Sequence, residues 1–107
     1  MRLPPALAAS ATPRILAALG EPPARVLELG FAGIHAVPLR LAGFEVVVVE
    51  PDPAHLDRAR ERAGEALATV PDEPFDAVIV PDGTTAPAAP RVIVVGQDGS
   101  VWSSASS

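Results

Sequence analysis

The chain has 107 residues, a formal net charge of −5 and no cysteine. This length accommodates a single domain over residues 1–107 with one hydrophobic core, and it leaves no room for separate cofactor and substrate domains. The lack of cysteine excludes disulfides, thiolate metal sites and a cysteine nucleophile, while the negative charge argues against a nucleic-acid partner. All eight basic residues are arginine, a usage typical of a GC-rich bacterial genome.

The chain shows no targeting or membrane segment that we recognise. Arg2, Pro4 and Pro5 precede only a short apolar stretch, which is unlike a signal peptide. No apolar run approaches the roughly 20 residues of a membrane span. We therefore expect a cytoplasmic protein with no membrane partner. The lead-in 1–10 and the tail 103–107 are expected to be disordered.

Apolar periodicity and turn residues predict alternating helices and strands. The four consecutive valines of 46–49 indicate a strand that is covered on both faces. Pro38 predicts a kink or a late start in the second helix. The stretch 81–90 is rich in proline and alanine and predicts a loop. The predicted helices cover 12–19, 34–42 and 54–69, and the predicted strands cover 25–29, 44–50, 75–80, 91–95 and, as a short returning edge, 101–102.

This element order predicts an α/β protein with a minimal Rossmann-like three-layer sandwich. Right-handed crossovers between successive strands favour a mostly parallel sheet of four or five strands in the order 2-1-3-4. Ligands of such sheets bind at the carboxyl ends of the strands. The first two strands therefore define the place to look for a site.

Two features point to that place. The first strand runs into Gly30-Phe31-Ala32-Gly33, a turn in which glycine permits a close approach of a ligand to the backbone and which opens a helix. Glu50 ends the second strand, 20 residues after Gly30, where a carboxylate can accept hydrogen bonds from ribose hydroxyls. The alternative reading is a strand–helix turn and a solvated acid. Glu28 lies within an apolar strand, so its carboxylate must either line a solvent-filled crevice or have a polar partner. Arg25 and a backbone donor are the candidates for that partner.

The region from about 11 to 95 resembles class I S-adenosylmethionine-dependent methyltransferases. Val26-Leu27-Glu28-Leu29-Gly30 is similar to the first motif of that family, Val49-Glu50-Pro51-Asp52 to the acidic end of its second strand, and 74–80 to its fourth strand. The resemblance implies S-adenosylmethionine or S-adenosylhomocysteine as the nucleoside-containing ligand. It implies that Glu28 and Gly30 contact the methionine end, Glu50 the ribose and Pro51 the adenine, with Phe31, Ala32 and Gly33 completing the binding turn.

Departures from the family pattern support a second hypothesis. The glycine turn is one residue short, Phe31 stands where a small residue is common, and the chain between Ala63 and Phe75 is too short for a further strand. Elements that build a methyl-acceptor pocket are not recognisable after Val95. The chain therefore resembles an incomplete, degenerate family member: a binding protein that transfers a methyl group only when a partner supplies the acceptor site, or a non-catalytic module for protein interaction or regulation.

No catalytic residue or metal ligand set is assigned. His35 and His55 lack a second ligand at metal spacing, so capping or packing is expected for His35 and exposure for His55. Asp52 suits a helix N-terminus, and the arginines of 58–62 alternate with acids as on a solvated face. Asp82, after the third strand, is the one candidate for a catalytic acid. The carboxyl-terminal strands 91–95 and 101–102, which carry few charges and include Trp102, predict a homodimer through that edge.

Overall fold

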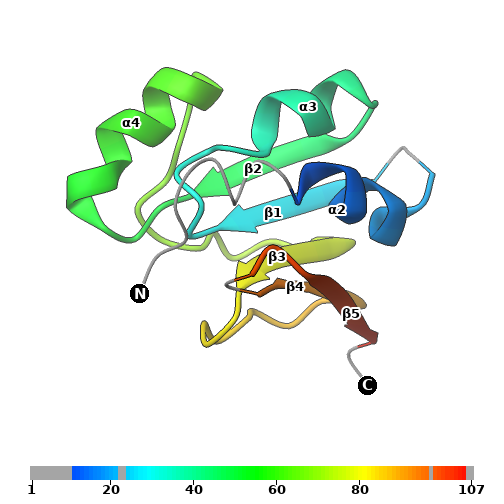
Figure 1. Ribbon diagram of the computed structural model, residues 1–107. Helices are drawn as coiled ribbons and strands as arrows, with labels where there is room; N and C mark the ends of the chain where they lie inside the picture. The colour runs from blue at the N-terminus through cyan, green and yellow to red at the C-terminus, as the bar shows by residue number, and fades with distance from the viewer. Residues whose placement is uncertain (1–10, 22–23, 97, 106–107) are drawn as a thin grey trace.

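Five strands form one sheet in the order β2-β1-β3-β4-β5 (Figure 1). The computed structural model describes residues 11–21, 24–96 and 98–105. The strands β1 to β4 run parallel, and β5 returns antiparallel to β4. The predicted order of the first four strands is confirmed. The elements are α2 (Thr12–Leu19), β1 (Arg25–Leu29), α3 (Ala36–Leu41), β2 (Glu45–Val49), α4 (Pro53–Ala63), β3 (Ala77–Pro81), β4 (Arg91–Val95) and β5 (Val101–Ala105).

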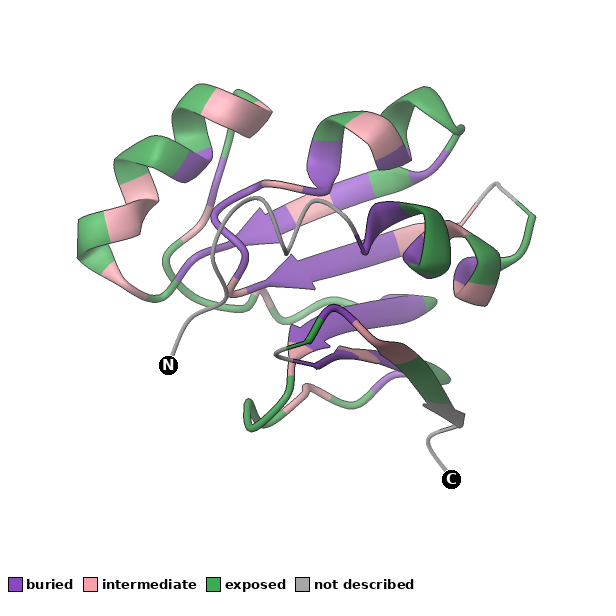
Figure 2. Ribbon diagram, viewed as in Figure 1, coloured by how far each residue is buried: buried purple, intermediate pink, exposed green. Residues whose placement is uncertain are grey.

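The central strands are covered on both faces, as their apolar runs predict (Figure 2). β1 lies between β2 and β3, with Leu27 opposite Val47 on one side and Val78 on the other. The two faces then collect different side chains, because neighbouring residues of a strand point to opposite sides. Val26 and Glu28 face the helices, whereas the side chains at 27 and 29 face away from them.

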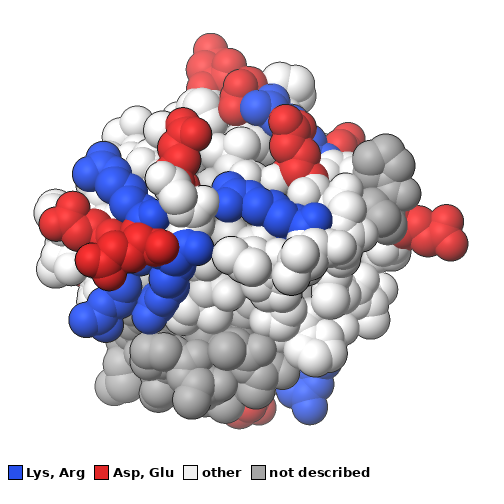
Figure 3. Space-filling view, turned by 90° about the horizontal axis from the view of Figure 1, so that it is seen from above, with Lys and Arg blue, Asp and Glu red and all other residues white. Residues whose placement is uncertain are grey.

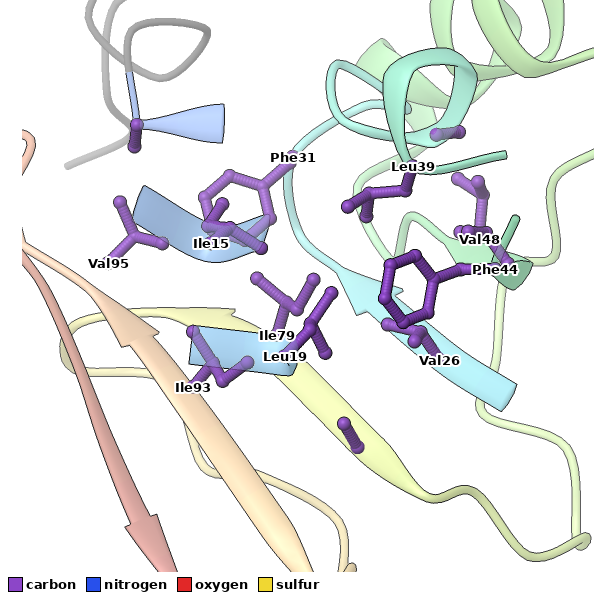
Figure 4. Close-up of a cluster of buried hydrophobic side chains, with 14 of the residues drawn as sticks. Ile15, Leu19, Val26, Phe31, Leu39, Phe44, Val48, Ile79, Ile93 and Val95 are labelled. Atoms are coloured by element: carbon purple, nitrogen blue, oxygen red, sulfur yellow. The ribbon is translucent and has the colours of Figure 1, made fainter. Parts of the chain in front are cut away.

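All three described helices cover the same face of the sheet. Ile15 and Leu19 of α2 pack with Phe31 and with Ile79 and Ile93 of the sheet (Figure 4). The opposite face is covered by the segments 67–75 and 82–90, which contribute Leu67, Phe75, Ala86 and Ala89 and form no helix. The predicted second helical layer is therefore not found in the part of the chain that the structure describes. Those connecting segments are short and rich in proline, which does not sustain a helix.

Helix α4 is shorter than predicted. It ends at Ala63 because Gly64 adopts a φ of +83° and its N–H bonds to the carbonyl of Arg60. Leu67, which lies within the predicted helix 54–69, instead forms a parallel bridge with Val49. Its N–H donates to the carbonyl of Val48, and its carbonyl accepts from Glu50 N. A single residue thus lies along the outer edge of β2, where too little chain remains for a whole strand.

The carboxyl-terminal strand is longer than predicted. β5 extends from Val101 to Ala105, so the part of the expected disordered tail at 103–105 is a strand paired with β4. Residues 106–107 and the lead-in 1–10 lie outside the described residues. Helix α3 begins late, at Ala36, in agreement with the effect expected of Pro38. None of the helices among residues 11–21, 24–96 and 98–105 has the length and apolarity to cross a membrane.

Candidate functional site

The turn after β1 depends on left-handed backbone conformations. Gly30, Ala32 and Gly33 have φ values of +87°, +52° and +77°. A side chain at Gly33 would place its Cβ 3.1 Å from the carbonyl oxygen of Ala59, so this glycine lets α4 approach the turn. A Cβ at Gly30 would lie 3.4 Å from the ring of Pro81 in β3. Close packing against α4 accounts for Gly33, whereas the left-handed φ accounts for Gly30, whose nearest contact is at an ordinary distance.

Glu50 lies directly against this turn. Its Oε1 accepts a hydrogen bond from Ala32 N at 3.1 Å, and its Oε2 accepts one from Asp52 N at 3.0 Å. The side chain is fully buried, and the residue takes part in further contacts. The structure therefore brings the acid at the end of β2 to the glycine turn at the end of β1, as the spacing predicts.

The residues after Glu50 open towards solvent. Pro51 is exposed, and Asp52 begins α4 by accepting a hydrogen bond from Ala54 N at 2.9 Å. This cap confirms the helix-terminal role expected of Asp52. His55 is half-buried rather than exposed, with Nε2 3.5 Å from the Asp52 carboxylate.

Glu28 is the penultimate residue of β1, and its carboxylate lies close enough to Glu50 for their charges to interact. It faces the helix layer, is fully buried, and its Oε2 accepts a hydrogen bond from His35 N at 2.6 Å. Thus a backbone donor is the partner that the carboxylate needs. Its Oε1 has no hydrogen-bond partner among the described residues.

The surroundings of Glu28 disfavour its charged form. Burial raises the pKa of Glu28 to about 7, and the neighbouring Glu50 adds to the rise. The hydrogen bond from His35 N and the positive charges of Arg40 and Arg62 act in the opposite direction, but more weakly. Close to neutral pH the side chain is therefore divided between a neutral and a charged form.

His35 joins the same buried cluster. Its Nδ1 lies 2.8 Å from Thr12 Oγ1 of α2, while its Nε2 finds no hydrogen-bond partner in the part of the chain that the structure describes. Burial lowers the pKa of His35 to about 4, so the ring is neutral at pH 7. The edge of the ring meets Phe31 with 4.9 Å between centroids. The packing role predicted for His35 is confirmed. Nothing in the sequence indicates that Thr12 contacts His35.

Phe31 turns away from the candidate binding edge. Its ring is 3% exposed and lies in the core near Ile15 (Figure 4). The aromatic side chain in the turn thus extends the hydrophobic core.

Two surface pockets lie elsewhere on the described part of the chain. One follows the outer edge of β2 between Arg40 and Glu65, and the other lies between Phe75 and Pro90. Neither is lined by Glu28, Glu50 or the turn residues 30–33. Within the described ranges, no three histidine or acidic side chains come together as a metal site would need.

The arginines of α4 share their surface with acids. Viewed onto the helix layer, positive and negative side chains are interleaved (Figure 3). Arg60 Nη1 lies 3.8 Å from Asp57 Oδ1 in an exposed pair, which contributes little to stability. Arg62 instead donates to the carbonyl of Ala32 at 3.2 Å, tying α4 to the glycine turn.

Comparison with known proteins adds no assignment. No model of a protein family matches the sequence, and a search of curated proteins found no similar sequence. The structural conclusion is an α/β domain with a five-stranded, mostly parallel sheet.

Proposed function

We propose that the protein binds the adenosyl part of S-adenosylmethionine, or of its demethylated product, at the carboxyl edge of β1 and β2. One observation carries the proposal: the Glu50 carboxylate lies 3.1 Å from the amide of Ala32 in the glycine turn. An acid and a glycine turn at the ends of adjacent parallel strands suit recognition of a nucleoside. The resemblance of the two segments to methyltransferase motifs supports the same ligand class.

The residues at this edge fit such a ligand in part. Glu50 would accept from the ribose hydroxyls, Gly30 would allow close approach, and exposed Pro51 would flank the base. Glu28 does not fit, because its carboxylate faces the helix layer and receives His35 N. Because Glu50 is fully buried, binding requires this edge to open and the ribose to compete with the contacts that Glu50 makes.

The proposal concerns binding. When bound, S-adenosylmethionine supplies a methyl group on a sulfonium centre, which a nucleophile can attack. The chain's own residues would hold the ribose and position the turn.

Calorimetric titration with S-adenosylmethionine and S-adenosylhomocysteine tests this proposal. Glu50→Gln keeps an acceptor oxygen but removes the charge, and we expect it to weaken binding by roughly 10- to 100-fold, because a charge-assisted hydrogen bond contributes about 1.5–3 kcal/mol. Glu45→Gln, at the exposed start of the same strand, is the matched control and should bind like the parent. The absence of heat and of a thermal shift for the parent at millimolar ligand would refute the proposal.

The burial of Glu50 favours a second candidate, a non-catalytic interaction module. Both carboxylate oxygens accept main-chain N–H groups, so the acid can serve to join β2, the turn and α4. In that case the parent binds neither ligand, while Glu50→Gln still lowers the free energy of unfolding, by about 1–3 kcal/mol. Denaturant unfolding of both variants beside the titration separates the two candidates.

A further inference from the structure

The outer edge of β5 carries backbone groups that no described residue satisfies. β5 is the last strand of the sheet order and pairs only with β4. The N–H of Gly96 donates to the carbonyl of Ser100 at 2.7 Å, so the backbone N–H and C=O groups of Ser100 point towards β4. The backbone groups of successive residues in a strand point to alternate sides, so the N–H and C=O groups of Trp102 and Ser104 also point towards β4. The N–H and C=O groups of 101, 103 and 105 therefore point outward.

This edge has none of the features that prevent strand pairing. Its sequence, Val101-Trp102-Ser103-Ser104-Ala105, contains no charge and no proline, and the strand has no bulge in its register with β4. Trp102 is 45% exposed. Its neighbour in β4, Val94, is half-buried and lies on the face without helices. An apolar surface thus continues from the face of the sheet to its open edge.

We propose that a second copy of this chain pairs with β5 through a two-fold axis at Ser103, which joins the two sheets into one. An antiparallel strand is complementary to itself, because each residue pair recurs after the rotation. With the axis at Ser103, this residue pairs with its own copy and Val101 pairs with Ala105 of the partner. The outward groups named above then satisfy one another.

The charges at the ends of β5 suit this arrangement. Asp98 lies in the turn before the strand, and Arg91 lies opposite its last residue, Ala105. An antiparallel copy brings the turn of one chain to the end of the partner's sheet where Arg91 lies. Arg14 donates to the carbonyl of Gly99 at 2.9 Å and so lies in the same turn region as Asp98. The pairing therefore does not bring together acidic side chains without a neighbouring positive charge.

The pairing also gives an optical signal. Trp102 is the single tryptophan, and the chain has no tyrosine. The two Trp102 side chains become diagonal neighbours on the face without helices, within reach of each other. We expect the emission of Trp102 to shift to shorter wavelength as the protein concentration rises through the dissociation constant.

Light scattering after size exclusion measures the association. The parent is expected to show twice the chain mass of 11.0 kDa at high concentration. Amide exchange of 101, 103 and 105 should slow over the same concentration range, a readout that needs no variant. A mass of 11.0 kDa at millimolar protein, or no slowing at these amides, overturns the proposal.

Charge variants at the axis locate the interface. Ser103 is exposed, so Ser103→Lys and Ser103→Asp place like charges opposite each other at the axis, and each variant alone should be monomeric. An equimolar mixture should recover the doubled mass. Ser103→Thr is the matched neutral control and remains a dimer. Failure of the mixture to associate contradicts the axis.

A variant at another exposed apolar residue completes the design. Leu41, at the end of α3, is 84% exposed and is the natural competitor for an interface. Leu41→Lys should leave the mass doubled. Loss of the dimer in this variant, with retention in Ser103→Lys, overturns the proposal in favour of α3.

Discussion

At the scale of single residues, the buried pair Glu28 and His35 has opposing responses to pH. Glu28 has a pKa raised to about 7, so its contribution to stability is complete below its ordinary pKa of 4.5 and is lost as pH rises towards 7. His35 has a pKa lowered to about 4, so its contribution is complete above 6.5 and is lost as pH falls towards 4. Between about pH 4.5 and 6.5 the free energy of unfolding falls with pH because of Glu28 and rises with pH because of His35, and the two changes nearly cancel.

Glu28→Gln should expose this cancellation. The amide oxygen can still accept from His35 N, but the side chain no longer ionises. We expect the variant to be about 3 kcal/mol more stable relative to the parent at pH 8 than at pH 4, from the displacement of the Glu28 pKa. Between pH 4 and 6.5 its stability should rise steeply. Urea unfolding across this range measures both effects, and a parallel pair of curves would show that folding does not shift the pKa of Glu28.

At the scale of elements, the glycine turn joins β1, α3 and α4. Gly33 combines a left-handed backbone with a neighbouring carbonyl 3.1 Å from the place of a Cβ. Gly64, which ends α4, shares the left-handed φ but has no atom within 4 Å of that place. The two positions therefore separate backbone strain from close packing.

Gly33→Ala is expected to cost more than Gly64→Ala. The left-handed conformation costs about 1–2 kcal/mol in either variant, and only Gly33→Ala must also displace α4. We expect a total of about 2–4 kcal/mol for Gly33→Ala from strain plus overpacking. Chemical unfolding of the two variants measures the difference. Equal losses would mean that α4 can shift without cost.

At the scale of the whole molecule, the two faces of the sheet are unequal. The helix-bearing face holds the larger cluster, and Arg91 fastens α2 to it by donating to the carbonyls of Ala18 and Leu19 at 2.9 and 2.8 Å. The other face is covered by loops, and towards β5 it leaves Val92 and Val94 half-buried. Most of the hydrophobic stabilisation should therefore come from the helix side.

Ile79→Ala and Val94→Ala test this inequality. Ile79 is fully buried beneath the helices, so its truncation should cost about 2–5 kcal/mol, a large share of the 5–15 kcal/mol typical of a domain. Val94 is only half-buried, and its loss should cost about 1 kcal/mol. Thermal and urea unfolding give both values. Comparable losses would indicate that the loop-covered face is packed as tightly as the helical one.

The sequence by itself determined the alternation of elements, the order of four parallel strands and the meeting of Glu50 with the glycine turn. Apolar runs, proline and glycine act locally, and the right hand of the crossovers then limits the order. The acid and the turn meet because the carboxyl ends of adjacent parallel strands share one edge. These properties require only neighbouring residues and chain chirality.

Only the tertiary structure decided which faces are covered and which polar groups meet. Thr12 and His35 are 23 residues apart, and they meet because α2 packs across the sheet. Leu67 leaves its expected helix because the edge of β2 offers hydrogen bonds after Gly64 ends α4. Ser103 belongs to a strand rather than a tail because β4 provides a ladder partner. Such contacts depend on which of several partners, distant in the sequence, a residue meets in the folded chain. The local sequence pattern does not specify that partner.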